Sequence, residues 1–189
     1  MKQYRPRLSK WEYELINKHR NNVGVGIIGD THEPFCHPEY RNFVYDVFDR
    51  FQVKDIVHIG DEVDNAALSY HESMVEMPNA ESEAEQAQKS MEQWYKTFPD
   101  VKVCVGNHSA LPFRQATTAG IPKRFLKSYE EIWNAPKGWK WDLQWEIDGV
   151  LYEHGTGSSG AMAHKNRAIA NRQSTVIGHC HSFGGVNYM

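Results

Sequence analysis

The sequence VGVGIIGDTH, residues 23–32, joins a run of β-branched apolar residues to a glycine and then to an aspartate and a histidine. So short an apolar run predicts a buried β-strand that ends at the glycine. Two later runs, at 55–59 and 101–105, also end in a glycine that polar residues follow. The same arrangement therefore occurs three times between residues 23 and 108.

Helical patterns separate these runs. Apolar side chains recur with the spacing of an amphipathic helix along residues 40–51 and again along 84–98. The spacing Ser82-Glu83-Ala84-Glu85 is that of a capping box and predicts that the second helix begins there. The alternation of strands and helices predicts a parallel sheet with right-handed crossovers. Ligands of such sheets bind beyond the carboxyl ends of the strands, where the polar residues lie.

The second half of the chain predicts a hairpin, a helix and one more strand. Trp141–Ile147 and Val150–Glu153 are apolar runs that flank Asp148-Gly149, a turn sequence typical of β-hairpins. Residues 161–171 have helical spacing, and 175–177 form a short strand pattern that ends in glycine.

The chain has 189 residues, which is enough for one domain with a real core. A capping-box spacing at Ser9 predicts a helix that runs to about Arg20. We expect residues 1–22 to form a helical extension that packs on a single domain of residues 23–189.

Composition and charge exclude several classes of protein. The 21 basic and 24 acidic residues give a formal charge of −3, so the whole molecule has no general attraction for nucleic acid. The three cysteines are odd in number and widely spaced, which argues against a disulfide scaffold. We find no apolar stretch of the ~20 residues that a membrane span needs and no signal-peptide core. These features predict a soluble, cytoplasmic protein.

Seven side chains of types that bind divalent cations lie in five clusters, each beside a glycine. They are Asp30, His32, Asp61, Asn107, His154, His179 and His181. Oxygen and imidazole donors without thiolate suit Mn²⁺, Fe, Zn²⁺ or Ni²⁺, with Mn²⁺ favoured, rather than Ca²⁺. Asp61 could bridge two cations with its two oxygens. Two cations ~3.5–4 Å apart can hold a hydroxide and clamp a phosphate group.

Two further residues fit catalytic roles beside such a centre. His108 follows Asn107 and is suited to donate a proton to a leaving oxygen or to stabilise a charged transition state. Asp64 could orient that imidazole, as carboxylates commonly do. A single cluster would more simply be a loop turn, and His154 could be a structural histidine. The occurrence of all five clusters together favours a metal site.

The five clusters resemble the sequence blocks of the calcineurin-like metallophosphoesterase superfamily. Its blocks GDxH, GDxxD, GNH(D/E), a histidine before glycine, and GHxH occur in this order between Gly29 and His181. By this resemblance one cation binds Asp30, His32, Asp61 and His181, and the other binds Asp61, Asn107, His154 and His179. His108 would be the catalytic histidine and Asp64 its partner. The resemblance implies an α/β fold, a four-layer αββα sandwich of two mixed β-sheets flanked by helices, with the site at the carboxyl ends of the strands.

The chain departs from the family pattern at several positions. Ser109 replaces the acidic residue that often follows GNH, and Glu33 stands where glycine is common. Asn65 stands where phosphoprotein phosphatases have a phosphate-gripping arginine, which argues against that subgroup. The sequence ends eight residues after His181, so we expect either a compact domain or one truncated at its C-terminus. The segments 119–122 and 136–139 are also similar to phage-encoded members.

The function expected from these residues and this resemblance is metal-dependent hydrolysis of phosphate esters by a hydroxide held between two cations. Asn65 and local sets of basic residues favour a phosphodiester substrate, a nucleotide or nucleic acid. Arg114 follows the catalytic block and could grip phosphate in place of the missing arginine. A phosphomonoesterase and a non-catalytic binding scaffold are the alternatives. The presence of His108 and of all seven ligand types counts against the scaffold.

Overall fold

A computed structural model describes residues 9–10, 14, 24–70, 78–181 and 184–186. Most of the predicted helix from Ser9 to Arg20, and with it most of the predicted extension 1–22, lies outside the described residues. The described elements, in chain order, are β1 (Val25–Ile28), α2 (Tyr40–Phe51), β2 (Asp55–His58), η1 (Ala66–Leu68), α3 (Ala80–Thr97), β3 (Val101–Cys104), α4 (Leu111–Thr118), η2 (Lys123–Phe125), α5 (Tyr129–Ile132), β4 (Trp139–Asp142), β5 (Gln144–Ile147), β6 (Val150–Glu153), α6 (Ala163–Asn171) and β7 (Ser174–Ile177).

The first sheet has the strand order β1-β2-β3-β4, and its described strands all run parallel. Its first three strands are those predicted from the apolar runs, and α2 and α3 connect them as predicted. Each connection returns the chain to the same end of the sheet, because a helical crossover leads from one strand to the start of the next. The carboxyl ends of β1, β2 and β3 therefore lie together.

The second sheet has the order β5-β6-β7, with β5 antiparallel and β7 parallel to β6. The predicted hairpin is confirmed: both turn residues adopt positive φ, 51° at Asp148 and 74° at Gly149, as a two-residue hairpin turn requires. We expected two mixed sheets, and among the described strands only this sheet is mixed. The hairpin is the reason, because it alone reverses the chain direction without a helical crossover.

The predicted strand Trp141–Ile147 is wrong as a single element. Trp139–Asp142 pairs with β3 in the first sheet, and Gln144–Ile147 pairs with β6 in the second. Leu143 lies between them, is 73% exposed, and donates its N–H to Asp142 Oδ1 at 2.7 Å. The chain passes from one sheet to the other at this residue. A continuous apolar pattern does not reveal such a passage, because both strands are half buried.

The predicted start of α3 at Ser82 is also wrong. The helix begins at Ala80, and the side chain of Asn79 accepts the N–H of Ser82 at 2.9 Å. Asparagine is a strong N-cap residue. Its side chain here pairs the N–H of Ser82, one of the main-chain donors of the first turn that have no partner within the helix. The apolar side of the helix faces the core as predicted, with Ala87, Met91 and Trp94 buried.

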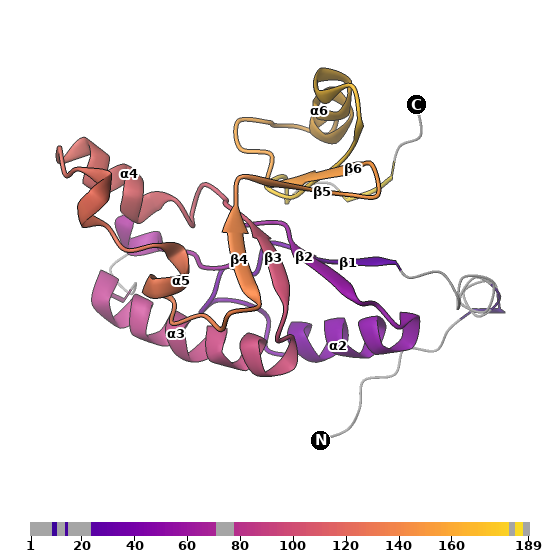
Figure 1. The fold of residues 1–189 in the computed structure, drawn as a ribbon, viewed down its shortest axis with the longest axis horizontal. Helices are drawn as coiled ribbons and strands as arrows, with labels where there is room; N and C mark the ends of the chain where they lie inside the picture. Colours follow the sequence, from indigo (N-terminus) through magenta and orange to yellow (C-terminus); the bar gives the residue numbers. More distant parts are fainter. Residues whose placement is uncertain (1–8, 11–13, 15–23, 71–77, 182–183, 187–189) are drawn as a thin grey trace.

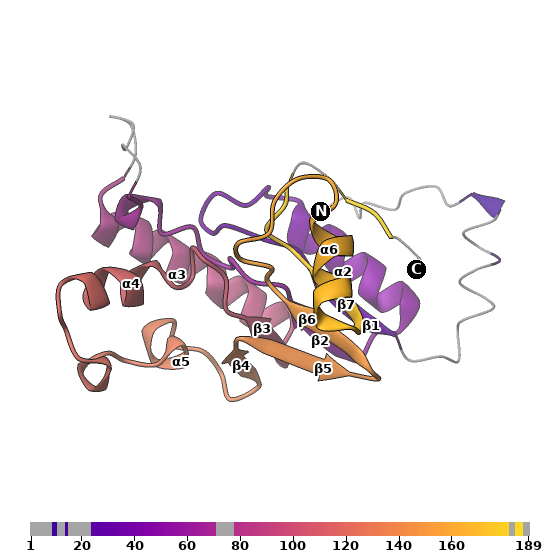
Figure 2. The same cartoon turned by 90° about the horizontal axis from the view of Figure 1, so that it is seen from above.

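The first sheet packs on both of its faces. One core lies between this sheet and the helices α2 and α3, and a smaller core lies between the two sheets. Figure 1 shows α2 and α3 below the first sheet, the second sheet above it and α6 above the second sheet. Figure 2 shows α6 over β6 and β7, with α4 and α5 at the opposite end of the molecule from α2. Among the described residues we find no helix of the length and apolarity that a membrane crossing requires.

Candidate metal centre

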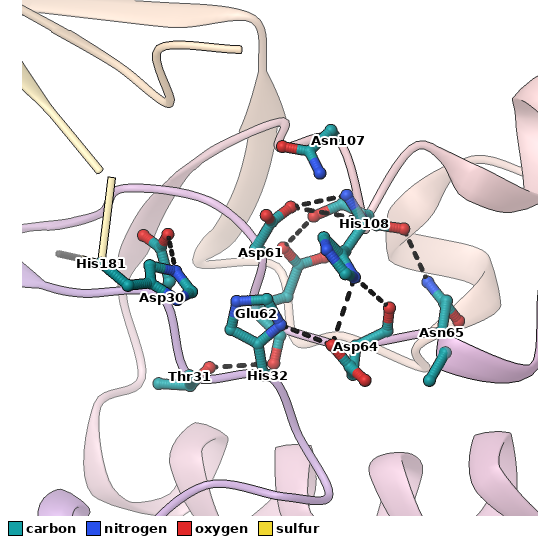
Figure 3. Close-up of polar contacts among 12 residues, drawn as sticks. Asp30, Thr31, His32, Asp61, Glu62, Asp64, Asn65, Asn107, His108 and His181 are labelled. Carbon is teal, nitrogen blue, oxygen red and sulfur yellow. Dashed lines mark hydrogen bonds and ion pairs between the residues drawn. The ribbon is translucent and has the colours of Figure 1, made fainter. Parts of the chain in front are cut away.

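The loops at the carboxyl ends of β1, β2, β6 and β7 bring six of the seven predicted ligands into two groups, and Figure 3 shows four of the six, Asp30, His32, Asp61 and His181. Within each group the possible ligand atoms lie within 4.8 Å of one another. The first group is Asp30, His32 and His181, and the second is Asp61, His154 and His179. The family resemblance implies a similar division but gives Asp61 to both cations, whereas Asp61 belongs here to the second group alone; Asn107 lies beside that group.

Two cluster glycines make room for ligands of other clusters. A Cβ atom at Gly106 would overlap the carboxylate of Asp61, and one at Gly178 would overlap the carboxylate of Asp30. Neither carboxylate can easily move aside, because hydrogen bonds to main-chain N–H groups hold each of them. The glycines are therefore required by close approach between loops that are far apart in sequence.

Three of the predicted ligands have a left-handed backbone. The φ angles are 48° at His32, 49° at Asp61 and 66° at His179. Non-glycine residues seldom adopt this conformation, which costs on the order of 1–3 kcal/mol for each residue, and it concentrates at functional sites. The conformation turns the side chains of these loop residues toward the common centre.

The contacts of His154 suit a bound cation. Its Nδ1 lies 3.1 Å from the main-chain oxygen of Ile59, an acceptor, so Nδ1 carries the proton. The other ring nitrogen, Nε2, lies 3.0 Å from Asp61 Oδ2 and 3.0 Å from Asn107 Oδ1. When His154 is neutral, its Nε2 is an acceptor, as are Asp61 Oδ2 and Asn107 Oδ1. A divalent cation bound among these three acceptors would pair all of them. A Cβ atom at Gly60 would overlap the ring, so the glycine of the second cluster also makes room for this histidine.

The first group leaves two acceptors unpaired. His32 Nδ1 lies 2.6 Å from Asp64 Oδ1 and donates to it, so His32 Nε2 carries a lone pair. Within the described structure, neither His32 Nε2 nor Asp30 Oδ1 has a hydrogen-bond partner, although both atoms are buried. The second oxygen of Asp30 accepts the N–H of His179 at 2.8 Å and lies 2.9 Å from His181 Nε2. Unpaired buried acceptors are costly, and a divalent cation would pair them.

Asp64 contacts both His32 and the predicted catalytic histidine. His108 Nδ1 donates to the main-chain oxygen of Asp64 at 2.7 Å and lies 3.2 Å from its Oδ1. The hydrogen bond with the Asp64 side chain raises the pKa of His108 to about 9. Burial alone would raise the pKa of Asp64, but the His108 and His32 donors hold it well below its usual value. The sequence predicts the contact with His108 and misses the contact with His32.

A buried carboxylate that the sequence analysis missed supports the loop of the predicted catalytic histidine. Glu62 is fully buried, and its two oxygens accept the hydroxyl of Ser109 at 2.6 Å and the indole N–H of Trp141 at 3.0 Å. Burial raises the pKa of Glu62 although both donors oppose the shift. The signal in the sequence is a charged residue between Asp61 and Val63, where a strand-end loop turns inward.

His58, the last residue of β2, is a buried histidine. Its Nδ1 accepts the N–H of Gly60 at 3.3 Å, so its Nε2 donates to the hydroxyl of Thr31 at 3.0 Å. Burial lowers the pKa of His58 to about 3. The ring joins the first and second clusters and does not belong to either ligand group.

Arg114 lies on the exposed side of α4, one turn after the helix begins. Its guanidinium group lies 5.6 Å from the centre of the Tyr70 ring. The helix follows His108 directly, since the N–H of Leu111 bonds the main-chain oxygen of His108 at 3.0 Å. The predicted phosphate contact of Arg114 stays a prediction.

Comparison with known proteins places this centre in a family. The calcineurin-like phosphoesterase family model matches residues 24–182, which include all five clusters. No curated protein and no solved structure matched the chain.

Proposed function

The chain belongs to the calcineurin-like phosphoesterase family, and on this premise we propose that it hydrolyses phosphate esters at a centre of two divalent cations. The observation that carries the proposal is the pair of buried acceptors without a partner in the described structure, Asp30 Oδ1 and His32 Nε2, next to a second group of possible ligand atoms. Our assignment gives Asp30, His32, Asp61 and His181 to one cation, and Asp61, Asn107, His154 and His179 to the other.

Two bound cations would lower the pKa of a water molecule between them and would neutralise charge on the phosphate group. Our assignment makes Asp61 the ligand that the two cations would share. Its Oδ2 faces His154 at 3.0 Å, and its Oδ1 accepts the main-chain N–H of His108 at 2.8 Å. The same carboxylate thus couples the position of the second ligand group to that of His108.

We assign to His108 the donation of a proton to the leaving oxygen, and its contacts support this role. Its main-chain N–H bonds Asp61, its main-chain oxygen accepts the side chain of Asn65 at 3.0 Å, and its Nδ1 bonds Asp64. The other ring nitrogen of His108, Nε2, takes part in none of these contacts and could contact a substrate. The His108 side chain is 31% exposed, whereas that of His154 is 1% exposed, so a substrate reaches the former from solvent.

Within this activity we propose a phosphodiester as the substrate and Mn²⁺ as the favoured metal. Asn65 bonds the main-chain oxygen of His108 and has no positive charge that would bind a phosphate group. The basic Arg114 lies on the exposed side of α4, the next helix. Rates with bis-p-nitrophenyl phosphate and p-nitrophenyl phosphate in Mn²⁺ compare diester with monoester hydrolysis. A faster rate with the monoester would contradict the diester proposal and favour a phosphomonoesterase.

The metal assignment is tested by counting Mn²⁺ ions per chain after equilibrium dialysis. Wild-type protein should bind two ions, and Asp61→Asn should bind fewer and lose turnover. Asp49→Asn, which removes an exposed carboxylate of α2, is the matched control. His108→Ala should bind two ions and lose most turnover. Binding of two ions by wild-type protein without hydrolysis of either ester would favour the non-catalytic scaffold.

A further inference from the structure

A cleft of about 850 Å³ opens beside the first ligand group. Four of the proposed ligands, Asp30, His32, His179 and His181, form part of its wall. A phosphate group held by the first cation would therefore lie at one end of this cleft, and the rest of the ester could extend into it.

Three aromatic side chains also line the cleft. Phe35, Tyr40 and Phe43 line it, and Phe35 and Phe43 are 49% and 41% exposed. The hydroxyl of Tyr40 accepts the N–H of Gly29 at 3.0 Å, which fixes this ring to the loop of the first cluster. The rings of Tyr40 and Phe43 stack, with their centres 6.4 Å apart and their planes at 23°. The wall thus presents ordered aromatic surface next to the ligands.

The charges around the cleft do not suit a polyanion. Of the described residues that line it, none is a lysine or an arginine, and Glu39 adds a negative charge. Arg114 lies on α4, which both views place toward the other end of the molecule from α2. A chain of phosphate groups would gain no counter-charge here. An uncharged organic group would cover the exposed rings.

We propose that the cleft binds a planar aromatic ring of the phosphate ester, while its phosphate group lies at the metal centre. This inference rests on the proposed function. The stacked rings of Tyr40 and Phe43 suit a flat aromatic ligand, because aromatic rings pack favourably against one another in offset or edge contacts. A nucleobase and a simple aryl group share this chemistry.

Binding of phosphonates tests the inference, because their phosphorus–carbon bond is not hydrolysed. In calorimetry with Mn²⁺-loaded protein, benzylphosphonate should bind about tenfold more tightly than methylphosphonate. Phe43→Ala should remove most of that difference and leave methylphosphonate binding unchanged. Phe51→Ala is the matched control: it is an aromatic residue of the same helix, 38% exposed, and does not line the cleft. A phosphonate that carries adenine distinguishes a site for a nucleobase from a site for a simple aryl group, since a nucleobase site binds it more tightly than benzylphosphonate.

Equal binding of benzylphosphonate and methylphosphonate would overturn the inference and leave the proposed function intact. Hexylphosphonate bound as tightly as benzylphosphonate would also overturn it, because the cleft would then take any apolar chain. If wild-type protein binds none of these phosphonates and hydrolyses neither p-nitrophenyl ester, the proposed function itself fails. The two failures therefore give different results.

Discussion

Asp64→Asn should weaken metal binding and turnover together, although Asp64 is not a proposed ligand. One carboxylate oxygen, Oδ1, accepts His32 Nδ1–H at 2.6 Å and lies 3.2 Å from His108 Nδ1. The negative charge strengthens both contacts. Asparagine can keep an acceptor oxygen at the same place, but this oxygen is neutral, so both imidazole contacts become weaker.

The size of each effect follows from the contact that is lost. Loss of an outer partner of a metal-binding histidine typically lowers metal affinity about 10–100-fold, which is about 1.4–2.7 kcal/mol. His108 keeps its hydrogen bond to the main-chain oxygen of Asp64 at 2.7 Å. At saturating Mn²⁺, kcat should therefore fall about 10–100-fold, which is less than the loss of a whole proton donor can cost.

Titration calorimetry with Mn²⁺ and kcat at saturating Mn²⁺ measure the two effects separately. His108→Ala should keep wild-type Mn²⁺ affinity and lose turnover, which separates the catalytic contact from the ligand contact. Asp55→Asn, whose carboxylate is 47% exposed and pairs with Lys102 at 3.1 Å, should change neither quantity. Mn²⁺ affinity of Asp64→Asn within twofold of wild type would refute the argument that Asp64 orients His32.

Three further perturbations test the packing of the centre. Gly106→Ala should lower the free energy of unfolding by about 1–3 kcal/mol and weaken Mn²⁺ binding, because the added Cβ would overlap Asp61. In the control Gly24→Ala, the Cβ meets nothing within 4 Å, so an equal loss of Mn²⁺ affinity there would contradict this reason. Ser109→Ala should cost about 1–3 kcal/mol in denaturant titration by removing a donor to buried Glu62, and wild-type stability would count against that contact. Chelation should lower unfolding free energy by about 2.7 kcal/mol per site relative to Mn²⁺ at 100 times its dissociation constant, and an unchanged midpoint would speak against a folded metal site.

The parts of the fold that could be predicted are those with local signals. Apolar runs that end in glycine gave β1, β2 and β3 nearly to the residue. Asp148-Gly149 predicted the hairpin because its backbone conformation depends on the two residues themselves. That the first three clusters lie at one edge of the first sheet could be predicted because parallel strands bring their carboxyl ends together, whereas the division of the ligands between two cations came from the family resemblance.

The parts that could not be predicted depend on contacts between distant segments. Nothing local indicates that the chain changes sheets at Leu143, because that passage depends on which strand each half pairs with. The contact between Asp64 and His32 joins residues 32 positions apart. Left-handed backbone at His32 and Asp61 opposes the preference of the residues and is held by the surrounding loops. Such features follow from the register of the sheet, which the sequence pattern does not give.

The departure from the family pattern at Ser109 has a structural explanation that bears on function. By sequence alone, Ser109 stands where relatives often have an acidic residue after the predicted catalytic histidine, so the support of that histidine is the point in question. In the structure the hydroxyl of Ser109 reaches the carboxylate of Glu62 at 2.6 Å, so a buried carboxylate still supports this loop from the second cluster. Serine is short enough for that contact, whereas an acidic residue there would place two carboxylates side by side in a buried space and raise the cost of ionising them. The serine and the glutamate are thus best understood as one unit, and the serine alone is not evidence for a degraded, non-catalytic site.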